Sequence, residues 1–464
     1  MEDISRRDFL RAGAALAATG FLLKAAGSLA QSPPGERPRQ DKTVEVLNPQ
    51  GRVPLSFFID DSTCLVNLGH FCMPQFAEAF PKREIYEKPW KTWPREIPDA
   101  FLRQFGLWCA EQGVKGKFSI VPCPACVGWL DRELPGWSRR ELLDSLKLVR
   151  EVMVPHWDIH PEMITHTRVI DLRTGRPMAE IGAATMENSY PQTKKTVDEL
   201  AAYVAYALRI LKNCEIPCEG ITTPGGFGGN VKVELSQAVG EAVREVFAAE
   251  VPHYFKYVSS GDQSPAPKLE HVTGLDTPSP RFVVSVPAGT GDWYGGWDGD
   301  RQPEADRYAN EDATSGRMVE LIDRGGPAVM LCHWPGLYGN GTKQGFQQCQ
   351  RVILAINRRY GERTIWMKIS ELARYWAAKE LTRIERSGGR VTLDAPVACP
   401  RFTLRAATTG AAQPRLLHAG APISLSEVDN PRDLKPGTWL REAKGMLVCF
   451  DLPKGQTTLN CEAA

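Results

Sequence analysis

Short apolar runs alternate with longer amphipathic segments from residue 53 to about residue 383 of this chain. Continuous apolar runs predict strands that are buried on both faces, and apolar residues three and four positions apart predict helices with one buried face. The predicted strands are 53–59, 117–122, 152–155, 327–333 and 364–370, and the clearest helices are 98–113, 138–151 and 196–213. Repeated strand–helix units predict an α/β domain, built either as a parallel sheet covered by helices or as a closed barrel.

After about residue 384 the pattern changes to short alternating runs separated by Gly, Pro and Asp, such as GGRVTLDAP and GMLVCFDLP. Alternation with a period of two predicts half-buried strands. We therefore expect residues 384–464 to form a small β-rich accessory domain, which either caps the first domain or binds carbohydrate. A mature chain of roughly 420 residues is too long for one compact core, and residues 43–383 are expected to form the larger domain.

The N-terminus carries the pattern of an export signal. Residues 5–11, SRRDFLR, form a twin-arginine motif, and the apolar stretch that follows is too short to span a bilayer durably. Small residues up to Ala30 offer a cleavage site; an ordinary amphipathic helix is the alternative. We expect residues 1–30 to be a signal peptide read by the twin-arginine export machinery, and residues 31–42 to be a linker. The mature protein, without a stable membrane anchor, is then periplasmic or secreted.

Net charge and cysteine content restrict the classes of function that we expect. A net charge of +1 leaves no basic excess to replace the counterions of a nucleic acid, so a nucleic-acid partner is not expected. The twelve cysteines permit disulfides after export, but their pairing cannot be read from the sequence. Cys123-Pro-Ala-Cys126 lacks the context of a redox motif, which favours buried thiols or a disulfide. We assign the cysteines no catalytic role.

Three predicted strands end in side chains that bind metals or transfer protons. The first ends in Asp60-Asp61, the third in His156 and His160, and the fourth in His333. The carboxyl ends of parallel strands gather on one face, where active sites form, so we expect these side chains to meet. The alternatives are an acidic turn for the aspartates and core positions for the histidines.

The order of these residues resembles that of the polysaccharide deacetylases of the carbohydrate esterase superfamily. FFIDDS resembles the family's first motif, HWDIHP its two histidines separated by three residues, and Leu331-Cys332-His333 its last motif. The resemblance covers about residues 50 to 378. It implies that the fold is an irregular (β/α) barrel. It also implies that the protein is an exported, metal-dependent deacetylase and a divergent member of the family.

Carried over residue by residue, the resemblance implies Asp60 as the catalytic base and His333 as the catalytic acid. Asp61, His156 and His160 would then hold one divalent transition metal, Zn²⁺ first, with Co²⁺ or Ni²⁺ as alternatives. Such an ion keeps an open position, lowers the pKa of its water and polarises an acyl oxygen. The implied reaction removes acetyl groups from N- or O-acetylated carbohydrate.

The chain also departs from the family pattern. The family's third motif has an arginine two residues before a proline, which pairs with the base, whereas this chain has Thr222-Thr223-Pro224. Arg168 is a candidate replacement. Trp157 stands where the family has serine or threonine, and Asp292-Trp293 is the candidate fourth motif.

Four further residues are candidates for substrate binding, with loop structure or packing as the alternative for each: His166, Arg168, Trp293 and Tyr338. Aromatic rings in loops after strands stack well on sugar faces. The departures leave two other functions open, hydrolysis of a non-sugar amide on the same barrel and carbohydrate binding without turnover.

Overall fold

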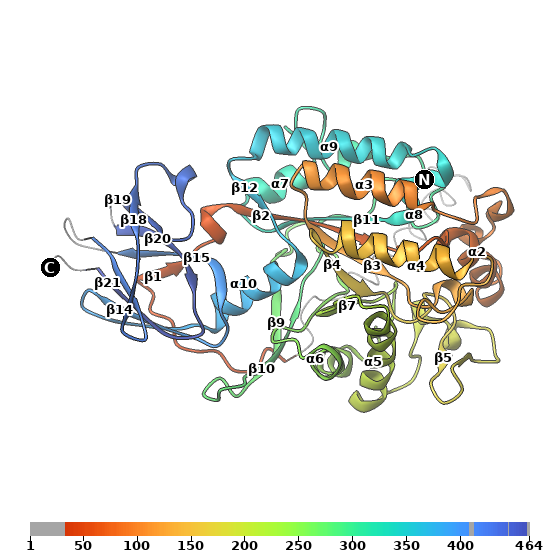
Figure 1. The fold of residues 1–464 in the computed structure, drawn as a ribbon, viewed down its shortest axis with the longest axis horizontal. Helices are drawn as coiled ribbons and strands as arrows, with labels where there is room; N and C mark the ends of the chain where they lie inside the picture. The colour runs from red at the N-terminus through yellow and green to blue at the C-terminus, as the bar shows by residue number, and fades with distance from the viewer. Residues whose placement is uncertain (1–32, 408–412, 444, 462–464) are drawn as a thin grey trace, which may run out of the picture.

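A computed structural model describes residues 33–407, 413–443 and 445–461 (Figure 1). The expected signal peptide, residues 1–30, lies outside the described residues. Within the described part, no helix combines the length and apolar character needed to cross a membrane. The expected α/β class is confirmed: helices surround mostly parallel strands in the larger region, and a β-rich region lies beside it (Figure 1).

The centre of the larger region is a parallel sheet in the order β11-β2-β3-β4, in which β12 pairs with the start of β2. Its strands are β2 Val53–Asp60, β3 Gly116–Ile120, β4 Trp157–Pro161, β11 Ala328–His333 and β12 Thr364–Trp366. All eight residues of β2 are buried, as its uninterrupted apolar run predicts for a strand covered on both faces. The carboxyl ends of these strands therefore meet at one edge.

A second sheet has the order β7-β8-β10-β9, with β9 antiparallel to β10. Its strands are β7 Gly220–Thr222, β8 His253–Phe255, β9 Lys268–Thr273 and β10 Arg281–Ser285. The two sheets are linked at two places. A parallel bridge joins Glu162 to Thr222, and the Gly289 N–H donates to the Val329 carbonyl at 2.8 Å.

Helices cover these sheets on their outer sides (Figure 1). Their bounds are α2 Leu68–Ala79, α3 Asp99–Glu111, α4 Arg139–Leu148, α5 Val197–Asn213, α6 Lys232–Phe247, α7 Arg317–Asp323, α8 Trp334–Tyr338, α9 Gln344–Tyr360 and α10 Ile369–Leu381. The predicted capping box of Ser138 and Glu141 is present at the start of α4. It stabilises the helix that leads into β4.

One predicted strand was wrong. Residues 152–155 belong to the end of a helix and the turn after it, because α4 continues as a π-helical turn over Val149–Met153. The strand itself, β4, begins at Trp157. A short apolar run is typical of a buried helix end as well as of a strand. Here Val149 and Met153 are buried as part of a helical turn. This shift moves the carboxyl end of the strand from His156 to Pro161.

The β-rich region contains two further five-stranded sheets (Figure 1). One contains β1 Val44–Val46, β15 Cys399–Ala407, β18 Ser426–Val428, β19 Thr438–Glu442 and β20 Gly445–Leu452. The other contains β13 Arg383–Ser387, β14 Arg390–Ala395, β16 Arg415–His418, β17 Ala421–Ile423 and β21 Gly455–Asn460. Strand β1 was expected in the first domain, yet it pairs with β15.

The described part of the expected linker is also packed. Gly35 forms a bridge with Val272, and the Gln40 side chain donates to the carbonyls of Lys379 and Thr382. From Pro33 onward, the expected linker therefore lies against the folded part of the chain. The Gln40 side chain thereby gives hydrogen-bond partners to two backbone carbonyl groups.

All twelve cysteines lie among the described residues, and none of them forms a disulfide. Eleven are buried, and Cys126 is half-buried. A disulfide within Cys123-Pro-Ala-Cys126 is thus not formed. The buried-thiol interpretation is the one that agrees with the structure.

Candidate metal centre and active site

Asp61, Glu162 and His166 converge at the carboxyl edge of the central sheet. Asp61 follows β2 directly, and Glu162 and His166 follow β4. One potential ligand atom of each residue lies within 4.8 Å of the others, and all three residues are buried. Two carboxylates and an imidazole at this spacing form a donor set that suits a divalent cation.

Direct contacts hold the three side chains in place. His166 Nε2 lies 2.7 Å from Asp61 Oδ1 and 3.6 Å from Glu162 Oε1. The second oxygen of Glu162, Oε2, accepts the Asp61 backbone N–H at 2.8 Å. One oxygen of Glu162 is thereby fixed by the backbone, and the other faces the imidazole.

The three groups perturb one another's protonation. Burial raises the pKa of Glu162 to about 8, with the neighbouring Asp60 and Asp61 carboxyls adding to the shift. Burial opposes charge on His166, but Asp61 outweighs it and holds the pKa of His166 well above its ordinary value. A cation that binds at these groups therefore competes with protons.

Two of the three residues have backbone conformations that few non-glycine residues adopt. The φ angles are +59° for Asp61 and +66° for His166. A left-handed conformation outside glycine costs free energy and is retained where the surroundings over-determine it, as at functional sites. The geometry of this edge is thus fixed by its environment.

Glu187 organises the loop that carries two of the ligands, and the sequence analysis missed it. Its Oε2 accepts the backbone N–H groups of Thr165 at 3.0 Å and His166 at 2.6 Å, and its Oε1 accepts that of Ile164 at 3.1 Å. The Tyr203 hydroxyl donates to the same Oε1 at 2.5 Å. Glu187 is fully buried, so these four bonds replace its hydration. No motif in the sequence marks it.

Asp60, the predicted base, lies beside the triad and forms a buried ion pair with Lys117 of β3. The Lys117 ammonium also donates to Ser119 Oγ at 3.0 Å and to the Ile59 carbonyl at 3.2 Å. Lys117 is fully buried, and its charge lies 5.0 Å from the Phe255 ring. Lys117 thus provides beside Asp60 the positive charge that an arginine of the third motif provides in the family.

Arg168 does not fill that role. Its guanidinium donates to the carbonyls of Met178 and Glu180, in the loop that follows it. The conjecture that Arg168 pairs with Asp60 was therefore wrong, because the carbonyl groups of its own loop fix the side chain there. Its candidacy as a substrate ligand is a prediction that no contact tests.

His333, the predicted acid, ends β11 on the same edge. Its Nδ1 lies 2.7 Å from Asp292 Oδ2, a contact that orients the ring. Burial disfavours the charged imidazole, but Asp61, Asp292 and Asp60 outweigh it and raise the pKa of His333 to about 10. With one quarter of its side chain exposed, His333 offers the most accessible group of the cluster.

His156 and His160 lie apart from the cluster. His156 precedes β4, at the opposite end of the strand from Glu162, and six residues at about 3.3 Å each separate the two by roughly 20 Å. Burial, with the charges of Lys115 and Lys368, lowers the pKa of His156. The expected role of His156 as a ligand beside Asp61 is thus geometrically excluded, because the strand begins later than the sequence predicted.

His160 lies within β4 and points at a different partner. Its Nε2 lies 3.1 Å from His253 Nε2, and its Nδ1 lies 3.4 Å from the Thr222 hydroxyl. His253 Nδ1 donates to the Val251 carbonyl at 3.0 Å, so its Nε2 accepts from His160. Both ring nitrogens of His160 are occupied by protein groups, which is inconsistent with its expected role as a metal ligand.

The candidate substrate residues fall into three situations. His166 belongs to the triad and is a candidate metal ligand, so its expected role against substrate remains a prediction. The Trp293 ring packs 4.8 Å from that of Tyr308 and lies under the Arg307 guanidinium. Tyr338 is half-buried at the end of α8, with its ring 5.1 Å from that of Phe101. Their contacts with a sugar remain predictions.

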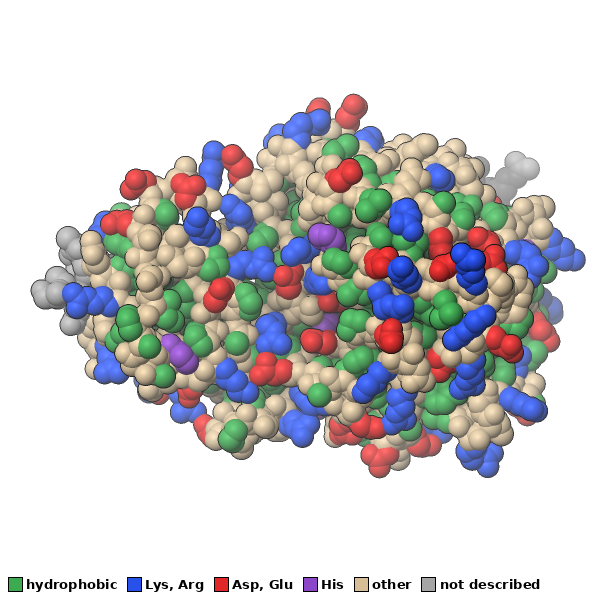
Figure 2. All heavy atoms as spheres, in the orientation of Figure 1, with side chains coloured by type: hydrophobic (Ala, Val, Ile, Leu, Met, Phe, Trp, Pro, Cys, Tyr) green, Lys and Arg blue, Asp and Glu red, His purple; other side chains and the backbone are tan. Residues whose placement is uncertain are grey.

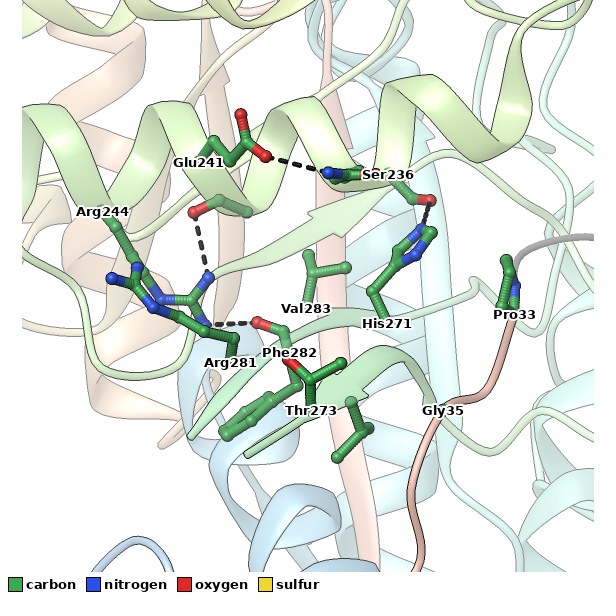
Figure 3. Close-up of a pocket in the computed structure, with 13 residues that line it drawn as sticks. Pro33, Gly35, Ser236, Glu241, Arg244, His271, Thr273, Arg281, Phe282 and Val283 are labelled. Atoms are coloured by element: carbon green, nitrogen blue, oxygen red, sulfur yellow. Dashed lines mark hydrogen bonds between the residues drawn. The ribbon is translucent and has the colours of Figure 1, made fainter. Parts of the chain in front are cut away.

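A cavity of about 590 Å³ lies elsewhere, between α6, β9, β10 and the chain near Pro33 (Figure 3). Its lining includes Ser236, whose hydroxyl lies 2.7 Å from His271 Nε2 and donates to the Val233 carbonyl. That hydroxyl therefore accepts from the imidazole and is not poised as a nucleophile. The residues of the triad do not line this cavity, which is separate from the candidate site.

Comparison with known proteins gives only distant likenesses to solved structures. No protein-family model matches the chain, and no curated protein matches it. A 4-alpha-glucanotransferase from Thermococcus litoralis is similar over 69% of this chain and 38% of its own, with 10% identity and a TM-score of 0.35. A protein described as a glycoside hydrolase/deacetylase from Parabacteroides distasonis is similar over 79% and 82%, with 9% identity and a TM-score of 0.40.

An alpha-fucosidase from Thermotoga maritima is similar over 90% of this chain and 97% of its own, with 12% identity and a TM-score of 0.30. The matched part of this chain thus spans well under half of the glucanotransferase. Identities and TM-scores of this size carry no argument about activity. The function has to be argued from the site.

Proposed function

We propose that this protein is a metal-dependent hydrolase that removes acetyl groups from N- or O-acetylated carbohydrate, on an irregular (β/α) barrel. The observation that carries the proposal is the convergence of a base, an acid and a three-residue donor set at the carboxyl edge of parallel strands. The two links between the central sheets support the barrel.

The donor set fits a divalent cation, since three buried ionisable groups whose charges would otherwise be costly face one another. Asp61, Glu162 and His166 would hold it. When bound, such an ion supplies Lewis acidity that lowers the pKa of water and polarises an acyl oxygen.

The chain's own residues supply the proton transfers. Asp60 accepts the proton of the water that attacks the acyl carbon, and the Lys117 ammonium beside it holds the side chain in place. On the other side, the protonated His333, oriented by Asp292, donates a proton to the departing nitrogen or oxygen. Base and acid are both held by a charged partner, which is the arrangement expected of an acid–base pair.

The sugar as substrate, export by the twin-arginine machinery and a periplasmic or secreted location are part of the same proposal. Residues 5–11 support export. Acidic and basic side chains are interspersed over the face shown in Figure 2, and a nucleic-acid partner is not part of the proposal. Trp293 and Tyr338 are the proposed aromatic contacts for the sugar.

The test is acetate release from acetylated chitooligosaccharides, peptidoglycan and xylan by the metal-loaded protein. Asp60→Asn and His333→Asn should each lower kcat by about 100-fold or more, since each removes a proton-transfer group. Both variants should retain the wild-type metal content. Activity confined to non-sugar amides would favour the alternative amide hydrolase, and binding of these glycans without turnover would favour a carbohydrate-binding protein.

A further inference from the structure

The donor set differs from the one that the family resemblance implies, and the difference is chemical. The resemblance implies one carboxylate and two imidazoles, whereas the structure brings together two carboxylates and one imidazole. The family spacing of three intervening residues is nevertheless met by Glu162-Met-Ile-Thr-His166. Glu162 therefore occupies the place of the first histidine of that motif.

Ligand type determines which cations a site prefers. Carboxylate oxygens suit hard cations such as Mn²⁺, Mg²⁺ and Ca²⁺, whereas imidazole nitrogens and thiolates favour Zn²⁺ and other softer ions. Replacing an imidazole by a carboxylate also adds one negative charge to the centre. Both changes favour a hard dication relative to zinc.

Contacts fix Glu162 at both its side chain and its backbone. Its residue is 2% exposed, and its Oε2 is fixed by the Asp61 N–H, which leaves Oε1 directed toward His166. Its backbone is fixed by the bridge to Thr222 of β7. Because both its backbone and its side chain are fixed, Glu162 presents Oε1 in a defined direction.

The thiol of Cys72 does not add a sulfur ligand to the three-residue donor set. Cys72 Sγ lies 4.0 Å from Nδ1 of His166, the ring nitrogen opposite the one that faces Asp61. The imidazole stands between the sulfur and the carboxylates. The thiol thus contacts a ligand from behind, where it orients the ring.

We propose that Glu162 sets the metal preference of this centre, shifting it from Zn²⁺ toward Mn²⁺ relative to an Asp–His–His site. The inference rests on the proposed function, since it specifies the cation of the same site. It concerns the ratio of the two affinities, because zinc binds most protein sites more tightly than manganese in absolute terms.

The experiment measures the dissociation constants of Mn²⁺ and Zn²⁺ for the full metal-stripped protein, by the loss of the free Mn²⁺ paramagnetic resonance signal and by competition with a zinc chelator. Glu162→His restores the family set and should shift the affinity ratio toward zinc by about tenfold or more. Glu162→Asp keeps a carboxylate and should weaken both metals while leaving the ratio near that of wild type.

Glu162→Cys provides a second route to a softer donor if the histidine variant fails to fold, and it should shift the ratio in the same direction. An unchanged ratio in a folded histidine or cysteine variant that still binds metal would overturn the inference and leave the proposed function standing. Failure of the wild-type protein to bind either ion would instead overturn the metal site itself.

Discussion

At the scale of single residues, the base and the acid of the proposed site each depend on one charged partner. Asp60 has Lys117, and His333 has Asp292. In the family that the chain resembles, an arginine of the third motif pairs with the base, and this chain has Thr222-Thr223-Pro224 there. A lysine from the neighbouring strand β3 was not predictable, since nothing in GVKGKFSIVP marks which of its two lysines points inward.

Lys117→Met should leave the Asp60 carboxylate buried and uncompensated. Breaking a buried ion pair from one side costs about 3–5 kcal/mol of unfolding free energy. We expect that loss in denaturant unfolding, with a fall in kcat. In the double variant with Asp60→Asn most of the lost stability should return, since no unpaired charge is left; a double variant as unstable as Lys117→Met alone would contradict the pairing.

Asp292→Asn tests the acid. The Asp292 carboxylate helps to raise the pKa of His333, so its neutralisation lowers that pKa. A general acid acts in its protonated form, and the alkaline limb of the kcat/KM profile should therefore move to lower pH. A pH–rate profile measures it. An alkaline limb that does not move would show that His333 is not the group that titrates there.

At the scale of elements, most strands and helices followed from periodicity, and one boundary decided the site. The apolar run of β2 and the capping box of α4 were both readable from the sequence. The start of β4 was not, because Val149–Met153 are buried from a helical turn and not from a strand. Because of that shift, Glu162 and His166 lie at the strand end where His156 and His160 were expected. The two pairs have the same spacing along the chain.

The loop after β4 is held by Glu187 from a separate short turn, so it should be sensitive to that carboxylate. Glu187→Gln keeps the size but replaces one accepting oxygen by a donor that faces backbone N–H groups. We expect metal affinity to fall by about 10–100-fold, the usual effect of losing a partner that orients ligands. Tyr203→Phe removes one of the four bonds and should have a smaller effect in the same titration.

The buried imidazole of His160 in β4 should make stability depend on pH. Burial, with His253 and Lys117, lowers the pKa of His160 well below its ordinary value. The folded pKa thus lies below the unfolded value of about 6.5, so this stabilisation is present above about pH 6.5 and is lost as the pH falls. The unfolding free energy should fall by up to about 1.4 kcal/mol per pH unit for this one proton.

Urea unfolding at a series of pH values between neutral and mildly acidic measures this slope. In His160→Gln the titrating group is gone, and the dependence on pH should be shallower. An equal slope in wild type and variant would assign the acid sensitivity to other groups.

At the scale of the whole molecule, the sequence predicted an α/β region followed by a β-rich region, and the structure contains both. It did not predict that β1, from the N-terminal side, joins a sheet of the C-terminal region. A three-residue strand is too short for its pattern to indicate a partner, and pairing over some 350 positions depends on tertiary packing. Strand β1 therefore ties the N-terminal side of the chain to the C-terminal region.

The most direct test of the account is the metal content of the full-length protein after loading and desalting. It should be compared between wild type and the single variants Asp61→Asn, Glu162→Gln, His166→Ala and His156→Ala. The structure predicts about one divalent ion per chain in wild type and in His156→Ala, and loss of the ion in the other three. Loss of the ion in His156→Ala, with retention in Glu162→Gln and His166→Ala, would contradict the centre described here.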